Sequence, residues 1–234
     1  MKEKLINNDI DYYFTRPSLR QEIIGKGEAL LYYPKEYDLD DPNSLFRINR
    51  NFYKPLNIQP NITDLILDEE GKLNDFTWNP SNQIQALLVS ERALMLIENY
   101  LIQSSNILPI NIIDKQSKKY KYFWIHFNED LKEYVDYKNS SFYIMCLSEW
   151  IEPIEINSIE DYEFKYKKIR EKDITFLIKA KKLEFFDDIY KYHLFSISRF
   201  SLPYLYISRA LKNEIEKMNL TGLDFWTLDG EPLF

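Results

Sequence analysis

Residues 204–228, YLYISRALKNEIEKMNLTGLDFWTL, constrain the fold more than any other part of this sequence. Leu205–Ile207 predicts a short strand, and Ser208 predicts a helix N-cap, because a serine oxygen can accept a hydrogen bond from an unpaired amide of the first turn. Gly222 predicts the end of that helix, and Leu223–Leu228 predicts a second strand. The apolar stripe of the helix is expected at Leu211, Ile215 and Met218.

A looser copy of this strand–Ser–helix unit begins at Leu87 and reads LLVSERALMLIENYLIQSSNILPINII. Ser90 is the predicted N-cap, and Val89 and Leu94 have the spacing of a hydrophobic staple. The second copy lacks the staple, since Lys212 stands where Leu94 stands in the first. This helix is expected to end near residues 103–106. Its apolar stripe is expected at Ala93, Leu94, Ile97 and Leu101.

The rest of the chain reads mainly as strands. Residues 107–113 and 120–127 flank a polar turn and predict a hairpin, whose second strand is apolar or aromatic on both faces. That strand is therefore either covered on both sides or presents aromatics such as Trp124 to a partner. Further strands are expected at 30–33, 45–48, 142–147, 193–197 and 151–156, the last at a sheet edge because of Pro153.

These elements together predict an α+β fold with a mixed, mainly antiparallel sheet and a few amphipathic helices. We expect one globular domain over residues 1–234. Within it, residues 1–84 form a portion rich in loops and strands, and residues 85–234 contain both strand–Ser–helix units. Aromatic residues make up 16% of the chain, which argues against disorder.

Charge and hydropathy exclude several kinds of partner. The formal net charge of −7 disfavours nucleic-acid binding, which usually shows a basic excess or patch. Two basic stretches, Lys165–Arg170 and Lys179–Lys182, have acids nearby and are interpreted as a solvated strand or helix face. No signal peptide or membrane-spanning run is present, and the single Cys146 is expected to be a buried thiol. The chain is therefore expected in the cytoplasm, without a membrane partner.

The sequence offers little for catalysis. With two histidines, one cysteine and no nucleophile elbow, it predicts no metal site, no cofactor and no enzymatic activity. A hydrolase-like cleft around His126 or His193 remains an alternative, because catalytic groups can assemble from distant positions.

Carboxylates in three segments are the remaining candidates for function. They are interpreted either as exposed loop charge or as part of a surface that binds a protein partner. Asp38 and Asp40 could also hold a divalent cation. The candidates, with the aromatic Trp124 added, are Asp38, Asp40, Asp41, Asp68, Glu69, Glu70, Asp187 and Asp188.

The C-terminal segment, with HLFSI at 193–197 before it, resembles a signature of bacterial immunity proteins from polymorphic toxin systems. This family is the eleventh immunity class, whose domain was first noticed in a myxobacterial protein and was formerly of unknown function. The matching positions are Ile207, Ser208, Leu211, Leu220, Thr221, Gly222 and Phe225. The order of elements from residue 85 onward is also similar, although the family often has Arg where Ser196 stands.

The resemblance implies an antitoxin that binds and neutralises a cognate toxin domain of a polymorphic or contact-dependent toxin system. An acidic surface would suit a basic toxin such as a nuclease, because opposite charge speeds encounter. Besides the hydrolase, a second alternative is a structural protein that assembles through aromatic strands. The sequence does not identify the toxin, the binding surface or the oligomeric state.

Overall fold

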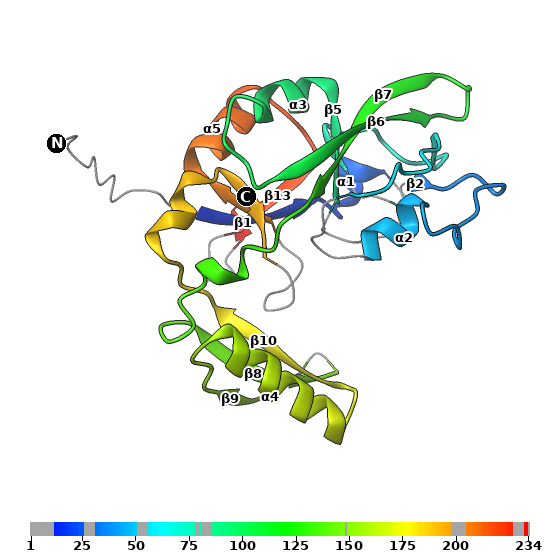
Figure 1. Ribbon diagram of the computed structural model, residues 1–234. Helices are drawn as coiled ribbons and strands as arrows, with labels where there is room; N and C mark the ends of the chain where they lie inside the picture. Colours follow the sequence, from blue (N-terminus) through cyan, green and yellow to red (C-terminus); the bar gives the residue numbers. More distant parts are fainter. Residues whose placement is uncertain are drawn as a thin grey trace.

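The structure, a computed structural model, describes residues 12–25, 31–50, 56–77, 80, 86–147, 149–197, 205–226 and 232–233. Within these residues the chain forms a body built on two sheets and a smaller lobe that projects from it (Figure 1). The strands pair antiparallel except for one pair in the larger sheet, so the expected α+β fold is confirmed.

The first sheet of the body has five strands and joins the two ends of the chain. Its order is β11 (Leu194–Ser196), β12 (Leu205–Ser208), β1 (Tyr12–Pro17), β13 (Leu223–Trp226) and β14 (Pro232–Leu233). The strand expected at 223–228 is thus confirmed as far as Trp226, and its last two residues lie outside the described ones.

The second sheet has six strands around the expected hairpin. Its order is β2 (Leu31–Tyr32), β3 (Leu65–Leu67), β6 (Ser105–Ile113), β7 (Lys119–Phe127), β5 (Ala86–Ser90) and β4 (Phe76–Thr77), with β3 and β6 parallel. The body's helices are α1 (Gln21–Ile24), α2 (Leu45–Arg50), α3 (Glu91–Ile97) and α5 (Arg209–Lys217), with short 3-10 turns η1 (Leu131–Tyr134) and η2 (Asp187–Lys191).

The two strand–Ser–helix units meet in the central core. Ser90 accepts a hydrogen bond from Ala93 N–H, and Ser208 accepts one from Leu211 N–H, each at 3.3 Å, so both predicted caps are confirmed. α3 and α5 lie side by side over the sheets (Figure 1), and their apolar faces share one core with the facing strands. That core includes Leu87, Val89, Leu94, Ile125, Ile207, Leu211, Ile215 and Leu220.

The predicted end of α3 was wrong, whereas α5 ends within a few residues of its predicted stop signal, Gly222. α3 stops at Ile97 rather than near residue 103, and Gln103 instead bonds to β11: its side-chain oxygen accepts from Ser196 N–H at 2.7 Å. After α5, Asn219 adopts φ 50°, and Leu220 N–H bonds to Ile215 C=O at 3.0 Å, which is a Schellman ending. Leu220 thereby packs in the core position that the sequence had assigned to the exposed Met218.

The segment at 45–48 was predicted as a strand and is the start of helix α2. Ser44 Oγ accepts a hydrogen bond from Arg47 N–H at 3.1 Å and caps the helix. Leu45 and Ile48 are buried three positions apart on one face, and a run this short does not distinguish helix from strand. Of the strand expected at 30–33, β2 confirms its middle, while Leu30 lies outside the described residues.

The lobe consists of a three-stranded sheet, in the order β10 (Phe176–Lys182), β8 (Ser141–Cys146) and β9 (Glu149–Ile154), covered on one face by helix α4 (Ile159–Lys172). β9 lies at the sheet edge, as Pro153 predicted. The basic stretch at 165–170 proves to be helical. The lobe's core residues Phe142, Tyr162 and Ile178 continue into the core beneath the five-stranded sheet at Phe195 and Tyr206.

A paired neck fixes the lobe to the body. Asp136 N–H bonds to Glu184 C=O at 2.9 Å, and Phe186 N–H bonds to Tyr134 C=O at 2.9 Å. Ser140 Oγ accepts from Glu184 N–H at 2.9 Å and donates to Asp136 C=O at 2.7 Å. Because both chain crossings are hydrogen bonded and the apolar core runs through them, the lobe is held by the same core as the body.

Gly222 generates the first prediction. Its φ is +101°, and a Cβ there would lie 2.0 Å from Phe76 C=O, so Gly222→Ala combines backbone strain with a clash against backbone. We expect the free energy of unfolding to fall by at least about 2 kcal/mol, measured by urea denaturation. Asn219→Gly is the matched control: it relaxes a positive φ at a helix end and should leave stability equal or higher. Equal stability of Gly222→Ala and the native chain would contradict this packing.

Candidate functional site

The most strongly bonded carboxylate of the body is Asp75, which the sequence interpretation missed. Its side chain is 7% exposed and accepts a bidentate pair from Arg92, with both N–O distances 2.7 Å. It also accepts from Ser90 Oγ at 2.7 Å and from Thr221 N–H at 2.9 Å. Asp75 thus joins the first turn of one strand–Ser–helix unit to the chain that follows the other.

The electrostatics of Asp75 are those of a structural carboxylate. Burial acts to raise its pKa, but the hydrogen bonds from Arg92, Ser90 and Thr221 outweigh it and hold the pKa at about 2. A signal for this contact was present in the sequence, because Arg92 lies in the first turn of a helix, where the dipole disfavours a cation unless a carboxylate is near.

His193 has the neighbours of a structural residue. Its Nδ1 lies 2.8 Å from Ser208 Oγ, and its ring stands edge-on to Tyr100. Burial lowers the pKa of His193, which favours a neutral ring that can accept the Ser208 proton. Since the Ser208 oxygen is already the N-cap of α5, this Ser–His contact joins β11 to the cap. His126, the other histidine, is buried in β7 with 1% exposure.

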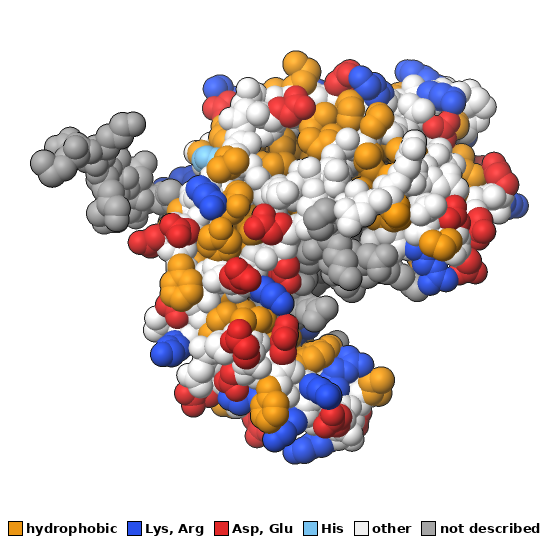
Figure 2. All heavy atoms as spheres, in the orientation of Figure 1, with side chains coloured by type: hydrophobic (Ala, Val, Ile, Leu, Met, Phe, Trp, Pro, Cys, Tyr) orange, Lys and Arg blue, Asp and Glu red, His pale blue; other side chains and the backbone are white. Residues whose placement is uncertain are grey.

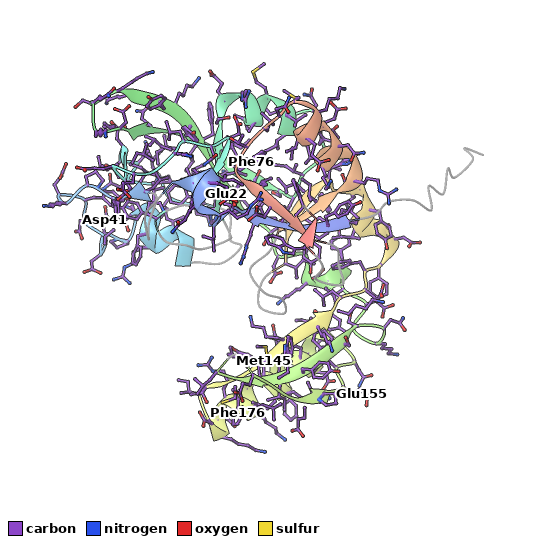
Figure 3. The ribbon with its side chains drawn as sticks, turned by 180° about the vertical axis from the view of Figure 1, so that it is seen from behind. Glu22, Asp41, Phe76, Met145, Glu155 and Phe176 are labelled. Carbon is purple, nitrogen blue, oxygen red and sulfur yellow. The ribbon has the colours of Figure 1, made fainter. Side chains whose placement is uncertain are left out.

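The structure places the predicted acidic residues in two separate regions. One region is the end of the body that carries β2 and α2, where Asp41 is labelled in Figure 3. It contains the loop with Asp38, Asp40 and Asp41 and the turn after β3 with Asp68, Glu69 and Glu70. Asp187 and Asp188 lie in the first turn of η2, near the neck. Within the described residues, no group of three His, Cys, Asp or Glu side chains is placed to hold a metal ion.

Several of these carboxylates are engaged within their own loops. Asp40 pairs with Arg47, and Asp38 accepts from Asp40 N–H at 2.9 Å. Asp41 accepts from Asn43 N–H and from the Asn61 amide, and these bonds lower its pKa. Asp68 accepts from Glu70 N–H and Tyr32 Oη. Glu69 and Glu70 are exposed, as are Asp187 and Asp188.

Trp124 was predicted to lie on the partner-binding surface, and the structure corrects this prediction. It is 1% exposed, because β7 lies between β6 and β5 in the sheet and its side chain enters the core formed with the N-terminal portion. Both faces of β7 are covered, so the aromatic strand presents no tryptophan to a partner. Cys146, expected to be buried, is partly exposed near the free end of the lobe.

Some of the exposed apolar residues lie on the lobe, where Figure 2 shows hydrophobic side chains among charged ones. Leu147 is 81% exposed in the β8–β9 turn, and Ile174 is 71% exposed just before β10. Cys146 Sγ lies 3.5 Å from Thr175 Oγ1, so these two segments are neighbours. We call Leu147, Trp150, Ile151 and Ile174 the free-end patch. None of the residues predicted from the sequence to bind a partner belongs to this patch.

The sequence matches the model of the immunity protein family Imm11 over residues 12–229. The match extends from β1 to the residues after β13 and therefore includes both sheets except for β14, together with the lobe and both strand–Ser–helix units. A search of curated proteins finds no match. None of the helices in the described ranges is both long and apolar enough to cross a membrane.

Asp75 generates the second prediction. Asp75→Asn removes the acceptor that Arg92 and Thr221 share, so the free energy of unfolding near pH 7 should fall by about 2–4 kcal/mol. The pKa of Asp75 is lower in the folded chain than its ordinary value of 3.8, so its contribution is complete above about pH 5 and is lost as pH falls toward 2.

Urea denaturation at a series of pH values measures both effects. The stability gap between the native chain and Asp75→Asn should narrow steadily below pH 5. Asp187→Asn, at an exposed carboxylate, serves as the control and should change stability by less than about 0.5 kcal/mol. A gap that stays constant down to pH 2 would show that Asp75 is not ionised and paired in the folded protein.

Proposed function

We propose, since this chain belongs to the Imm11 immunity protein family, that it is an antitoxin: it binds a cognate toxin domain and blocks its activity. The observation that carries the proposal is the family match over residues 12–229, which covers nearly the whole chain. The toxin would come from a polymorphic or contact-dependent system, and neutralisation would occur in the cytoplasm of the protected cell.

Binding rather than catalysis accounts best for the described side chains. Ser208 and His193, a close Ser–His pair, are used for the cap of α5 and for the contact between β12 and the residue just before β11. Asp75, the carboxylate with the strongest set of donors, is saturated by Arg92, Ser90 and Thr221. An inhibitor needs a rigid, accessible surface, which the body and its fixed lobe supply.

The distribution of charge supports a partner with a complementary distribution. Residues 165–182 contain eight Lys and Arg against two acids, a net charge of +6, within a chain of net charge −7. The remaining residues therefore carry −13. The exposed Asp38, Glu69 and Glu70 would attract a basic face of the toxin and speed encounter, while the cations of the lobe would face acidic groups.

The function is tested by co-expression with the C-terminal toxin domain encoded in the neighbouring gene. Cells that produce the toxin domain alone should stop growing, and cells that also produce this chain should grow. The two proteins should elute as one complex in size-exclusion chromatography. Growth arrest despite abundant soluble antitoxin, together with no complex, would refute the proposal.

The acidic residues generate a separate kinetic prediction. Neutralising the three together, by Asp38→Asn, Glu69→Gln and Glu70→Gln, should lower the association rate constant about three- to tenfold at low salt and leave dissociation nearly unchanged. Stopped-flow fluorescence at rising ionic strength measures this, and the difference should shrink as salt screens the charges. Asp187→Asn with Asp188→Asn is the comparison pair beside the neck. An unchanged association rate in the triple variant would remove these three from the encounter surface.

A further inference from the structure

The free-end patch is an apolar surface that the fold of the lobe leaves uncovered. α4 covers one face of the lobe's sheet, where Tyr162 contacts Phe142. Trp150 contacts Tyr143 edge-on at 5.5 Å and therefore lies on the opposite face. Leu147 and Ile174 lie where the strands end, and Figure 3 places Phe176, which pairs with Cys146, at the end of the lobe away from the body.

Local backbone irregularities present these side chains outward. Ile144 pairs with Glu152 and Met145 with Trp150, so Ile151 is the extra residue of a β-bulge, a device that changes the direction of a side chain. Leu147 adopts φ 47°, a conformation that favours Gly or Asn. A leucine in that conformation with 81% exposure buries little of its side chain within the chain itself.

Three cations in the C-terminal half of α4, the helix that leads to Ile174, lack carboxylate partners in the described part of the chain. Lys168 and Arg170 stack on Phe164 and Tyr166, and neither they nor Lys172 has a carboxylate within 4.0 Å among the described residues. The nearby Asp173 carboxylate is occupied by Thr175, whose N–H and Oγ1 bond to it at 2.8 and 2.7 Å. An apolar patch with charged groups on a neighbouring element matches the anatomy of a protein-binding surface, which has an apolar centre and a polar, solvent-accessible rim.

We propose that the free-end patch is the anchor by which this chain holds its toxin. It would occupy an apolar pocket of the toxin domain that has carboxylates at its rim, where Lys168, Arg170 and Lys172 would pair. The inference rests on the proposed function and names the surface that performs it. The hydrogen-bonded neck supports it, because a lobe fixed before binding loses little conformational freedom on association.

Two other occupants fit the observations less well. A symmetric dimer formed through this end would bring the two sets of unpaired cations together, which opposes association. Nucleic acid would suit the cations and aromatic rings, but three of the four patch residues, Leu147, Ile151 and Ile174, are aliphatic. Aliphatic side chains have no complement on a phosphate backbone, whereas an apolar pocket on a protein buries them.

Calorimetric titration with the neighbouring toxin domain tests the anchor. Trp150→Ala and Ile174→Ala should each raise Kd by about thirtyfold or more, mostly through faster dissociation. Met95→Ala is the matched control, since Met95 is 64% exposed on α3 of the body and should leave Kd within about twofold. Unchanged thermal melting of the variants would exclude unfolding as the cause.

Leu147→Asn separates binding from stability most sharply. Asparagine suits φ 47° better than leucine, so the variant should melt at an equal or higher temperature and yet bind the toxin domain at least about tenfold more weakly. Loss of binding with retained or improved stability is the result that a purely structural role for Leu147 would not produce.

The other outcomes are also decisive. If native protein binds the toxin domain and all patch variants bind equally well, the anchor lies elsewhere while the antitoxin function stands. If native protein forms no complex, the proposed function itself fails.

Concentration-dependent dimers in sedimentation velocity that Trp150→Ala abolishes would assign the patch to a second copy of this chain. A single-stranded oligonucleotide that binds native protein, and binds less well after Lys168→Glu and Lys172→Glu, would assign it to nucleic acid.

Discussion

The fold depends above all on the hydrogen bonds that converge on Asp75. Arg92 and Ser90 reach it from the start of α3, and Thr221 reaches it from the chain that follows α5. Phe76 N–H also bonds to Thr221 C=O at 3.0 Å, beside the position where Gly222 must lack a side chain. A charge this buried is tolerated only when its donors are in place, so these contacts fix how the two strand–Ser–helix units meet.

Local features of the fold were predictable, and long-range ones were not. The caps at Ser90 and Ser208 and the edge strand with Pro153 follow from interactions within a few residues. Asp75 and Thr221 are 146 positions apart, and no local pattern announces their contact. The short run at 45–48 has too few residues to separate helical from strand spacing. The local feature that favours a helix there is the N-cap hydrogen bond to Ser44 Oγ.

The candidate site was missed for a related reason. Trp124 was selected because aromatics are common at interfaces, but its burial depends on how many strands flank β7, which one sequence does not reveal. Leu147 and Ile174 were passed over because short apolar segments read as core. Only the structure shows that their strands end at the free end of a small lobe, where the sheet has no neighbour.

The lobe also explains how one chain holds strongly opposed charges. Residues 165–182 place +6 on α4 and β10, while the rest of the chain carries −13. Because the cations lie on a projecting lobe, they are separated from the acidic groups of the body. The apolar core that runs through the neck restricts motion of the lobe relative to the body. Under the proposed function, long-range attraction would act through the body's acids, while apolar burial would act at the lobe. Because salt weakens the first and leaves the second largely intact, encounter and retention of a partner would then be separately adjustable properties of one protein.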